Sequence, residues 1–174
     1  MEEYPFAGGK YAFTVCRIEP ENNLHLLLAA FEDDPPMPLV IVGNWQHSEY
    51  GQELLKNYGN RPGIYLLPPI YELEKLNAIR SRCSFYLHGH SCGGTNPSLV
   101  EAMYLGLAVV AYDVNFNRET TENRALYFDT SEALRKIILS TSDEERTAVG
   151  GTMREIAQRR YTWKRIAECY AKLF

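Results

Sequence analysis

The feature that most constrains the fold of this chain is the alternation of short apolar segments with longer stretches of helical periodicity. The short segments are rich in β-branched and aromatic residues, which favour strands. We expect strands over Lys10–Arg17, Pro38–Val42, Ile64–Leu67, Cys83–Leu87 and Ala108–Tyr112, and a weaker sixth strand over Ala125–Phe128. Apolar strands that alternate with helices predict a parallel sheet covered on both faces. The expected fold is therefore α/β, a Rossmann-like doubly wound parallel sheet that binds ligands at the carboxyl ends of its strands.

The stretches between these strands carry apolar residues at the spacing of helices with one buried face. The apolar positions are Leu24, Leu27, Leu28 and Phe31, then Tyr50, Leu54, Leu55 and Tyr58, then Leu73, Leu76 and Ile79, and then Ala133, Leu134, Ile137 and Ile138. Pro97 suits the first turn of another helix, because its missing N–H costs nothing there. A last apolar stripe is expected from Trp163 to Phe174, with Tyr161 and Trp163 as core anchors.

Length and composition predict one domain over residues 1–174, long enough to bury a core. No apolar run approaches the ~20 residues that cross a bilayer. The N-terminus, Met1-Glu2-Glu3-Tyr4, lacks the order of a signal peptide. The four cysteines are far apart and show no CxxC spacing, so we expect them to be reduced. Together these features predict a cytoplasmic protein.

The formal net charge of −4 gives no general signature of nucleic-acid binding, and we expect no nucleic-acid partner. Basic residues nevertheless gather near the C-terminus, at Arg154, Arg159, Arg160, Lys164, Arg165 and Lys172. One interpretation is a solvated helix face. The other is a basic surface that faces a further domain or anionic lipid, which would place the protein at the inner face of the plasma membrane.

The strongest local signal is the segment 88–101, HGHSCGGTNPSLVE, which comes after an expected strand and opens an expected helix. Its glycines let the backbone come close to a ligand. The exposed N–H groups and the dipole at a helix start attract an anion. A strand, a glycine-rich loop and a helix start together predict a phosphate-binding site.

Three alternatives in this region give weaker signals. His88, His90 and Cys92 alternate as zinc ligands could, but no fourth ligand occurs at a familiar spacing, and we expect no metal. Cys92 as a nucleophile has no evident base to activate it. His90 is expected either to line a sugar pocket or to be a structural histidine.

Asp113 and Glu119 could form an acid–base pair. The alternative is that Asp113 ends a strand while Asn117 caps a short helix. We favour the strand end for Asp113 and leave Glu119 open.

The segment Ser98–Met103, together with Gly106 and the run 108–111 after it, resembles the E-x7-E region of family-four GT-B glycosyltransferases. The resemblance extends back to residues 16–23, CRIEPENN, which are similar to the family's G-R-x-x-P-E-K-N turn. It extends forward to Asp113–Glu119 and Tyr161–Trp163. The combination of ENN with HGHSCGGTNPSL resembles a subgroup that builds bacterial surface polysaccharide, including O-antigen and rhamnosyltransferase-like enzymes.

The resemblance implies the C-terminal, donor-binding half of a retaining GT-B glycosyltransferase. Its donor would be a nucleotide sugar, with a UDP-sugar expected first. The full enzyme would transfer a hexose or N-acetylhexosamine to a glycan or undecaprenyl-linked acceptor in lipopolysaccharide biosynthesis. The resemblance also implies no cofactor and no metal. The catalytic groups are expected mainly on an N-terminal acceptor domain, so this chain alone should be inactive.

Carried over residue by residue, the resemblance implies a ribose contact for Glu101, because a carboxylate accepts from both hydroxyls of a diol. It implies a diphosphate contact for Arg17 and phosphate contacts for the helix start at Ser98 and Leu99. Base recognition falls near Ile70. Further donor contacts are expected from His90, Gly93, Gly94, Thr95 and Asn96.

Two positions depart from the family pattern. Gly93 stands where the family has its first glutamate, so sugar recognition must differ, and Thr95 and Asn96 are the best local substitutes. Asn22 stands where the family has a lysine, and Arg118 is a candidate to replace that cation.

Two other functions remain open from the sequence. The chain could be a stand-alone, non-catalytic nucleotide-binding or regulatory subunit. A dehydrogenase-like dinucleotide binder is disfavoured, because Arg17 stands after Val15 where G-x-G-x-x-G would begin.

Overall fold

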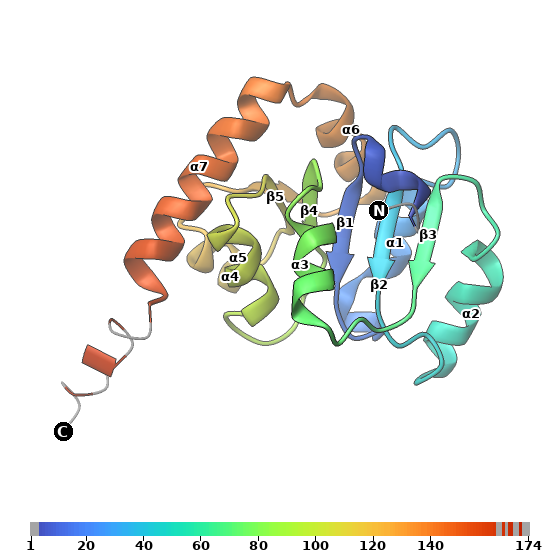
Figure 1. Cartoon of the computed structure of the whole chain (residues 1–174), viewed down its shortest axis with the longest axis horizontal. Coiled ribbons are helices and arrows are strands. Elements are labelled where there is room, and N and C mark those ends of the chain that lie inside the picture. The colour runs from blue at the N-terminus through green and yellow to red at the C-terminus, as the bar shows by residue number, and fades with distance from the viewer. Residues whose placement is uncertain (1–3, 163–164, 166, 169–170, 172–174) are drawn as a thin grey trace.

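The structure is a computed structural model that describes residues 4–162, 165, 167–168 and 171. Six parallel strands form one sheet in the order β3-β2-β1-β4-β5-β6. The strands are β1 (Ala12–Val15), β2 (Leu39–Val42), β3 (Ile64–Leu67), β4 (Phe85–His88), β5 (Val109–Tyr112) and β6 (Leu126–Phe128). The direction of winding reverses between β1 and β4, which lie side by side at the centre (Figure 1). This arrangement confirms the predicted doubly wound α/β fold.

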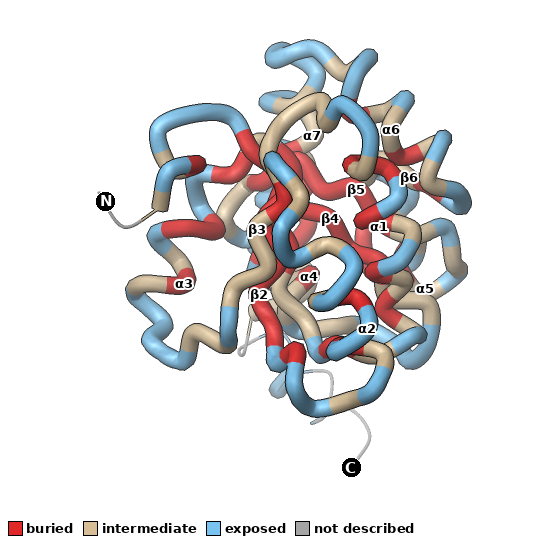
Figure 2. Tube along the Cα trace, turned by 90° about the vertical axis from the view of Figure 1, so that its right-hand side faces the viewer, coloured by how far each residue is buried: buried red, intermediate tan, exposed pale blue. Residues whose placement is uncertain are grey.

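Helices cover both faces of the sheet. The helices are α1 (Leu24–Ala30), α2 (Glu49–Tyr58), α3 (Leu73–Arg80), α4 (Pro97–Tyr104), α5 (Asn115–Thr120), α6 (Ser131–Ser140) and α7 (Asp143–Arg160), with short 3₁₀ turns at Pro5–Gly8 and Pro20–Asn22. Side chains of α1, α2 and α6 share one hydrophobic cluster with the sheet. Side chains of α3, α4 and α7 share the other. The domain is therefore a three-layer sandwich whose central layer is the most buried (Figure 2).

The strands supply both clusters because successive side chains point to opposite faces. In β1, Ala12 belongs to the first cluster and Phe13 to the second. All four residues of β2 are buried, as expected for a strand covered on both faces.

The six predicted strands and the predicted helices outside the C-terminal segment are all present, and strand β3 has the predicted bounds. One local prediction was wrong. Asn117 does not cap a helix, because α5 begins at Asn115 after Val114, and Asn117 lies fully buried inside it. Tyr161 packs partly buried against the second cluster, and its hydroxyl donates to the Thr120 carbonyl at 3.0 Å. Trp163 and much of the last predicted stripe lie outside the described residues.

Helix α7 is the longest helix and packs closely on the end of α4. A Cβ atom on Gly150 would lie 2.2 Å from the Gly106 carbonyl oxygen, so only glycine allows this approach. The Arg154 guanidinium closes the contact by donating to the Leu105 carbonyl at 2.9 Å. Among the described residues, no helix is long and apolar enough to cross a membrane.

This packing predicts opposite effects for two adjacent glycines of α7. Gly151→Ala should raise the free energy of unfolding by about 1 kcal/mol, because its Cβ would enter open space and alanine favours helix. Gly150→Ala should lower it by about 1–3 kcal/mol, because the same methyl group would collide with Gly106. Urea denaturation measures both changes. Equal effects in the two variants would contradict the close contact.

Candidate functional site

A cavity of about 380 Å³ opens at the carboxyl edge of the sheet, between the ends of β1 and β4. This is the point where the strand order reverses, which is where ligands bind in open α/β sheets. The loops after the two strands and the first turns of α4 form its wall. Its lining residues are Thr14, Val15, Cys16, Arg17, Asn22, His88, Gly89, His90, Asn96, Pro97, Ser98 and Glu101.

The loops after β1 and β4 are bonded directly to each other. Asn23 Nδ2 donates to the Gly89 carbonyl at 2.9 Å, and the Ser91 N–H and hydroxyl donate to the Glu21 carbonyl at 2.8 and 2.9 Å. Gly89 permits this contact, because a Cβ there would lie 2.2 Å from the Asn22 carbonyl oxygen. The ENN and HGHS motifs are thus two halves of one structure.

Asn22 and His90 continue this link inside the cavity. Asn22 is only 3% exposed, and its Nδ2 donates to the Arg17 carbonyl at 2.7 Å. Its Oδ1 therefore faces His90 Nδ1, so Nδ1 carries the proton and Nε2 is the acceptor of the neutral ring. Burial lowers the pKa of His90, and the positive charge of Arg17 lowers it further, while Glu21 acts in the opposite direction. His90 thus offers the site an uncharged ring with a hydrogen-bond acceptor.

Arg17 lies just after β1 and is exposed at the wall of the cavity. It forms no ion pair with any residue that the structure describes, the nearby Glu19 and Glu21 included. A guanidinium that has no carboxylate partner and lies at a cavity is available to an anionic ligand.

The first turn of α4 is capped by its own side chains. Asn96 Oδ1 accepts from the Ser98 N–H at 3.0 Å and from the Ser98 hydroxyl at 2.8 Å. The Leu99 and Val100 N–H groups bond to the Asn96 carbonyl. The N–H groups expected to bind phosphate are therefore already used within the turn.

The loop that precedes α4 supplies other donors. Within the described part of the chain, the N–H groups of Gly93 and Gly94 have no acceptor, and both residues are exposed. Gly93 has φ +117°, which L residues rarely adopt, and a Cβ there would lie 3.4 Å from His90 Nε2. The free N–H groups of Gly93 and Gly94 and the acceptor His90 Nε2 therefore lie close together in this loop.

Glu101, on the second turn of α4, borders two cavities. One is the polar cavity described above. The other is a more apolar cavity of about 550 Å³ between α3 and α4, lined by Asn77, Arg80, Thr95, Pro97, Val100, Glu101, Tyr104, Leu105 and Tyr161. Glu101 forms an ion pair with Arg80 at 2.5 Å, a partner that no pattern in the sequence indicates.

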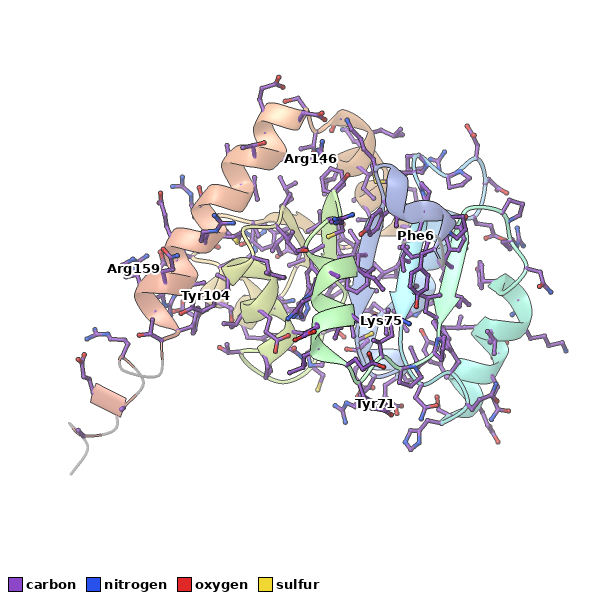
Figure 3. The ribbon with its side chains drawn as sticks, viewed as in Figure 1. Phe6, Tyr71, Lys75, Tyr104, Arg146 and Arg159 are labelled. Carbon is purple, nitrogen blue, oxygen red and sulfur yellow. The ribbon has the colours of Figure 1, made fainter. Side chains whose placement is uncertain are left out.

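The remaining predicted residues lie less directly at the polar cavity. Ile70 packs partly buried against the second cluster, and the Leu99 side chain is fully buried in the core. Thr95 lines the apolar cavity, with its hydroxyl 3.3 Å from that of Thr120. Tyr71, next to Ile70, projects from the loop between β3 and α3 and is 86% exposed (Figure 3).

Arg118 and the acid–base candidates are engaged elsewhere. Arg118 binds both oxygens of Asp113, at 2.5 and 2.7 Å, and its guanidinium lies over the Tyr127 ring. It is not among the residues that line the cavity. Glu119 pairs with Arg160 at 3.2 Å, so Asp113 and Glu119 each have a cationic partner of their own.

Two of the basic residues of α7, Arg159 and Arg160, are also paired with acidic residues, whereas Arg154 donates to a backbone carbonyl. Arg159 contacts Glu122 at 2.6 Å, and Arg160 contacts Glu122 at 3.3 Å as well as Glu119. Arg165 lies 3.5 Å from Glu168, whereas Lys164 and Lys172 fall outside the described residues. Arg159 projects outward from α7 (Figure 3).

His88 ends β4 and is buried at the floor of the cavity. Burial lowers the pKa of His88 to about 3, and the nearby His90 adds to this effect. Its Nε2 has no hydrogen-bond partner among the described residues. The rings of His88 and His90 lie 5.8 Å apart, while Cys92 is exposed. In the part of the chain that is described, no group of three or more His, Cys, Asp or Glu residues is arranged to hold a metal.

Comparisons with known proteins agree with this fold. Residues 2–155 match the family of Glycosyl transferases group 1. An uncharacterized glycosyltransferase of Methanocaldococcus jannaschii is 31% identical over 172 residues, which cover 92% of this chain and 43% of that protein. This chain therefore spans less than half the length of that curated relative.

Two solved structures show the same fold. HepE of Anabaena, in complex with UDP and glucose, has a TM-score of 0.81 at 20% identity, over 98% of this chain and 50% of that one. The C-terminal domain of the group 1 glycosyl transferase LpcC from Francisella tularensis has a TM-score of 0.72 at 17% identity, over 89% of this chain and 88% of that one.

The buried state of His88 predicts a pH dependence of stability. The unfolded histidine binds a proton below pH about 6.5, whereas the folded pKa of about 3 keeps the native ring neutral. Stability is therefore full above pH about 6.5 and falls as the pH decreases toward 3. From this residue alone, the free energy of unfolding should drop by about 2 kcal/mol between pH 7 and pH 5.

Urea denaturation of wild type and His88→Asn at the two pH values tests this prediction. Between pH 7 and pH 5, the free energy of unfolding of His88→Asn should fall by about 2 kcal/mol less than that of wild type. The control is His25→Asn, because His25 is exposed. The free energy of unfolding of this variant should fall between pH 7 and pH 5 as much as that of wild type. An identical drop in wild type and His88→Asn would show that His88 is not held neutral.

Proposed function

This chain belongs to the family of group 1 glycosyl transferases, and we propose that it binds the nucleoside-diphosphate sugar from which such an enzyme transfers its sugar. The observation that carries the proposal is the cavity at the reversal of strand order. Arg17 and Glu101 line it, and the exposed loop at Gly93 and Gly94 lies next to His90, another lining residue. A cation, free backbone N–H groups and a carboxylate are suited to a diphosphate and a ribose.

In the proposed complex, Arg17 and the N–H groups of Gly93 and Gly94 bind the diphosphate. The positive end of the α4 dipole adds to the favourable field. These groups stabilise the negative charge that develops on the leaving diphosphate without the help of a metal. Arg118 takes part only if it leaves Asp113, so Arg17 is the principal cation.

Glu101 accepts hydrogen bonds from the ribose hydroxyls, and the base lies toward the loop that contains Ile70. The sugar lies near His90, whose Nε2 is an acceptor beside the position of the family's first glutamate. With φ +117°, Gly93 could not carry a glutamate without a change in the loop. A neutral imidazole with Thr95 and the Asn96 amide thus replaces a carboxylate in contacting the sugar.

The finer parts of the proposal rest on the resemblance of the ENN and HGHS motifs to enzymes of bacterial surface polysaccharide. The donor is a UDP-sugar, and the transferred group is a hexose or N-acetylhexosamine. UDP and glucose are the molecules named with the HepE structure, which supports this choice. Transfer retains the anomeric configuration, and the acceptor is a glycan or an undecaprenyl-linked precursor of O-antigen, at the inner face of the membrane.

The proposal assigns acceptor binding and most catalytic groups to a further domain, because this chain corresponds to about half of HepE and to the C-terminal domain of LpcC. The chain alone should therefore bind the donor and transfer little or no sugar.

Calorimetric titration of UDP into the chain tests the donor site. Wild type should bind saturably, and Arg17→Met should weaken binding about ten- to a hundredfold, because a hydrogen bond to a charged group is worth ~1.5–3 kcal/mol. The control is Arg124→Met, which removes the same charge from an exposed position outside the cavity lining and should bind like wild type. Absent binding at millimolar UDP, or equal losses in the two variants, would contradict the proposed site.

A further inference from the structure

Arg80, at the end of α3, is a buried cation beside the proposed donor site. Its side chain is only 4% exposed, and arginine is rarely buried to this degree unless it is paired. One terminal nitrogen donates to Glu101 Oε2 at 2.5 Å, and the other donates to Asn77 Oδ1 at 2.6 Å. Its Nε is buried and has no partner among the described residues.

Stability alone is a poor explanation for this arrangement. Removing a guanidinium from water is costly, and a buried ion pair often contributes no more than apolar residues of the same volume. The unpartnered Nε adds to that cost. The location of Arg80 in the last turn of α3, at the negative end of the helix dipole, offsets only part of it.

The geometry of Glu101 indicates what Arg80 does instead. The Glu101 side chain is 54% exposed and stands at the boundary of two cavities. Within the described chain, Arg80 is the hydrogen-bond partner of this carboxylate, and it uses Oε2. Oε1 and the second lone pair of Oε2 remain for other donors.

We propose that Arg80 is a positioning residue, which holds the Glu101 carboxylate in the orientation that receives a vicinal diol of the ligand. This inference rests on the proposed function, in which the diol is the ribose of a nucleoside diphosphate. A glutamate without this support has three rotatable bonds and must be ordered when the ligand binds. Arg80 orders it in advance, which saves conformational entropy on binding.

The test compares two ligands, UDP and 2′,3′-dideoxyuridine diphosphate, which lacks both ribose hydroxyls. Affinities are measured by calorimetry for wild type, Arg80→Met and Glu101→Gln. Wild type should prefer UDP by about tenfold or more. Arg80→Met should lose most of this preference through weaker UDP binding, while its affinity for the dideoxy ligand stays unchanged. Glu101→Gln should lose the preference in the same way.

Arg61→Met is the matched control, since Arg61 pairs with Glu32 at 2.6 Å outside both cavities. It should keep the full preference. A role of Arg80 in folding alone would weaken both ligands equally, so a preference that survives in Arg80→Met overturns the proposal. If Arg80→Met fails to fold, Arg80→Lys carries the same comparison and should show an intermediate preference.

Failure of the underlying function gives a different result. If wild type binds neither ligand, the donor site itself is wrong and the inference falls with it. If wild type binds UDP and the dideoxy ligand equally well, diphosphate binding at the site stands, while the ribose contact of Glu101 and the positioning role of Arg80 are both refuted.

Discussion

The candidate site depends on one constraint, the direct bonding of the loop after β1 to the loop after β4. The sheet brings these two strand ends together, but the strands alone do not fix the paths of the loops beyond them. Asn23 and Gly89, with Asn22 and His90 beside them, join the two loops through short polar contacts, and glycine at 89 is the condition for their approach. Arg17, the glycine-rich loop and the first turn of α4 take their positions from this junction.

The groups next to this junction differ in charge: the two histidines are neutral, and Arg17 is positive. His88 and His90 are both kept neutral, His88 by burial and His90 by burial together with Arg17. Arg17 is therefore the principal positive group at the polar cavity, with Arg80 concealed behind Glu101. Arg118 is compensated by Asp113, and Arg159 and Arg160 are compensated by Glu122. The cavity thus has a localised positive field rather than a generally basic surface, which suits a small anion better than a polyanion.

Much of the fold could be predicted from periodicity alone, because parallel strands that are buried on both faces leave continuous apolar segments such as Leu39–Val42. The glycine-rich loop was also evident, since glycines, a proline and a helix start succeed one another in the chain. Arg80 and Asn117 could not be found in this way. Each is a polar residue that is buried through partners distant in the sequence, and within its own segment it has the appearance of a surface residue. The capping of α4 by Asn96 is local, but the succession of glycines, proline and helix start does not show that the N–H groups of the helix start are already bonded.

The contact between Gly106 and Gly150 has a consequence for the wall of the cavity. Helix α7 is 18 residues, about 27 Å, long, and its backbone meets the turn after α4 with no side chain between them. This close approach lets side chains further along both helices pack in one cluster, which contains Leu99, Ala102 and Met103 of α4 and Met153, Ile156 and Ala157 of α7. Helix α4 carries Glu101 on its second turn, so the helix that presents this carboxylate to the cavity is backed by the long helix behind it.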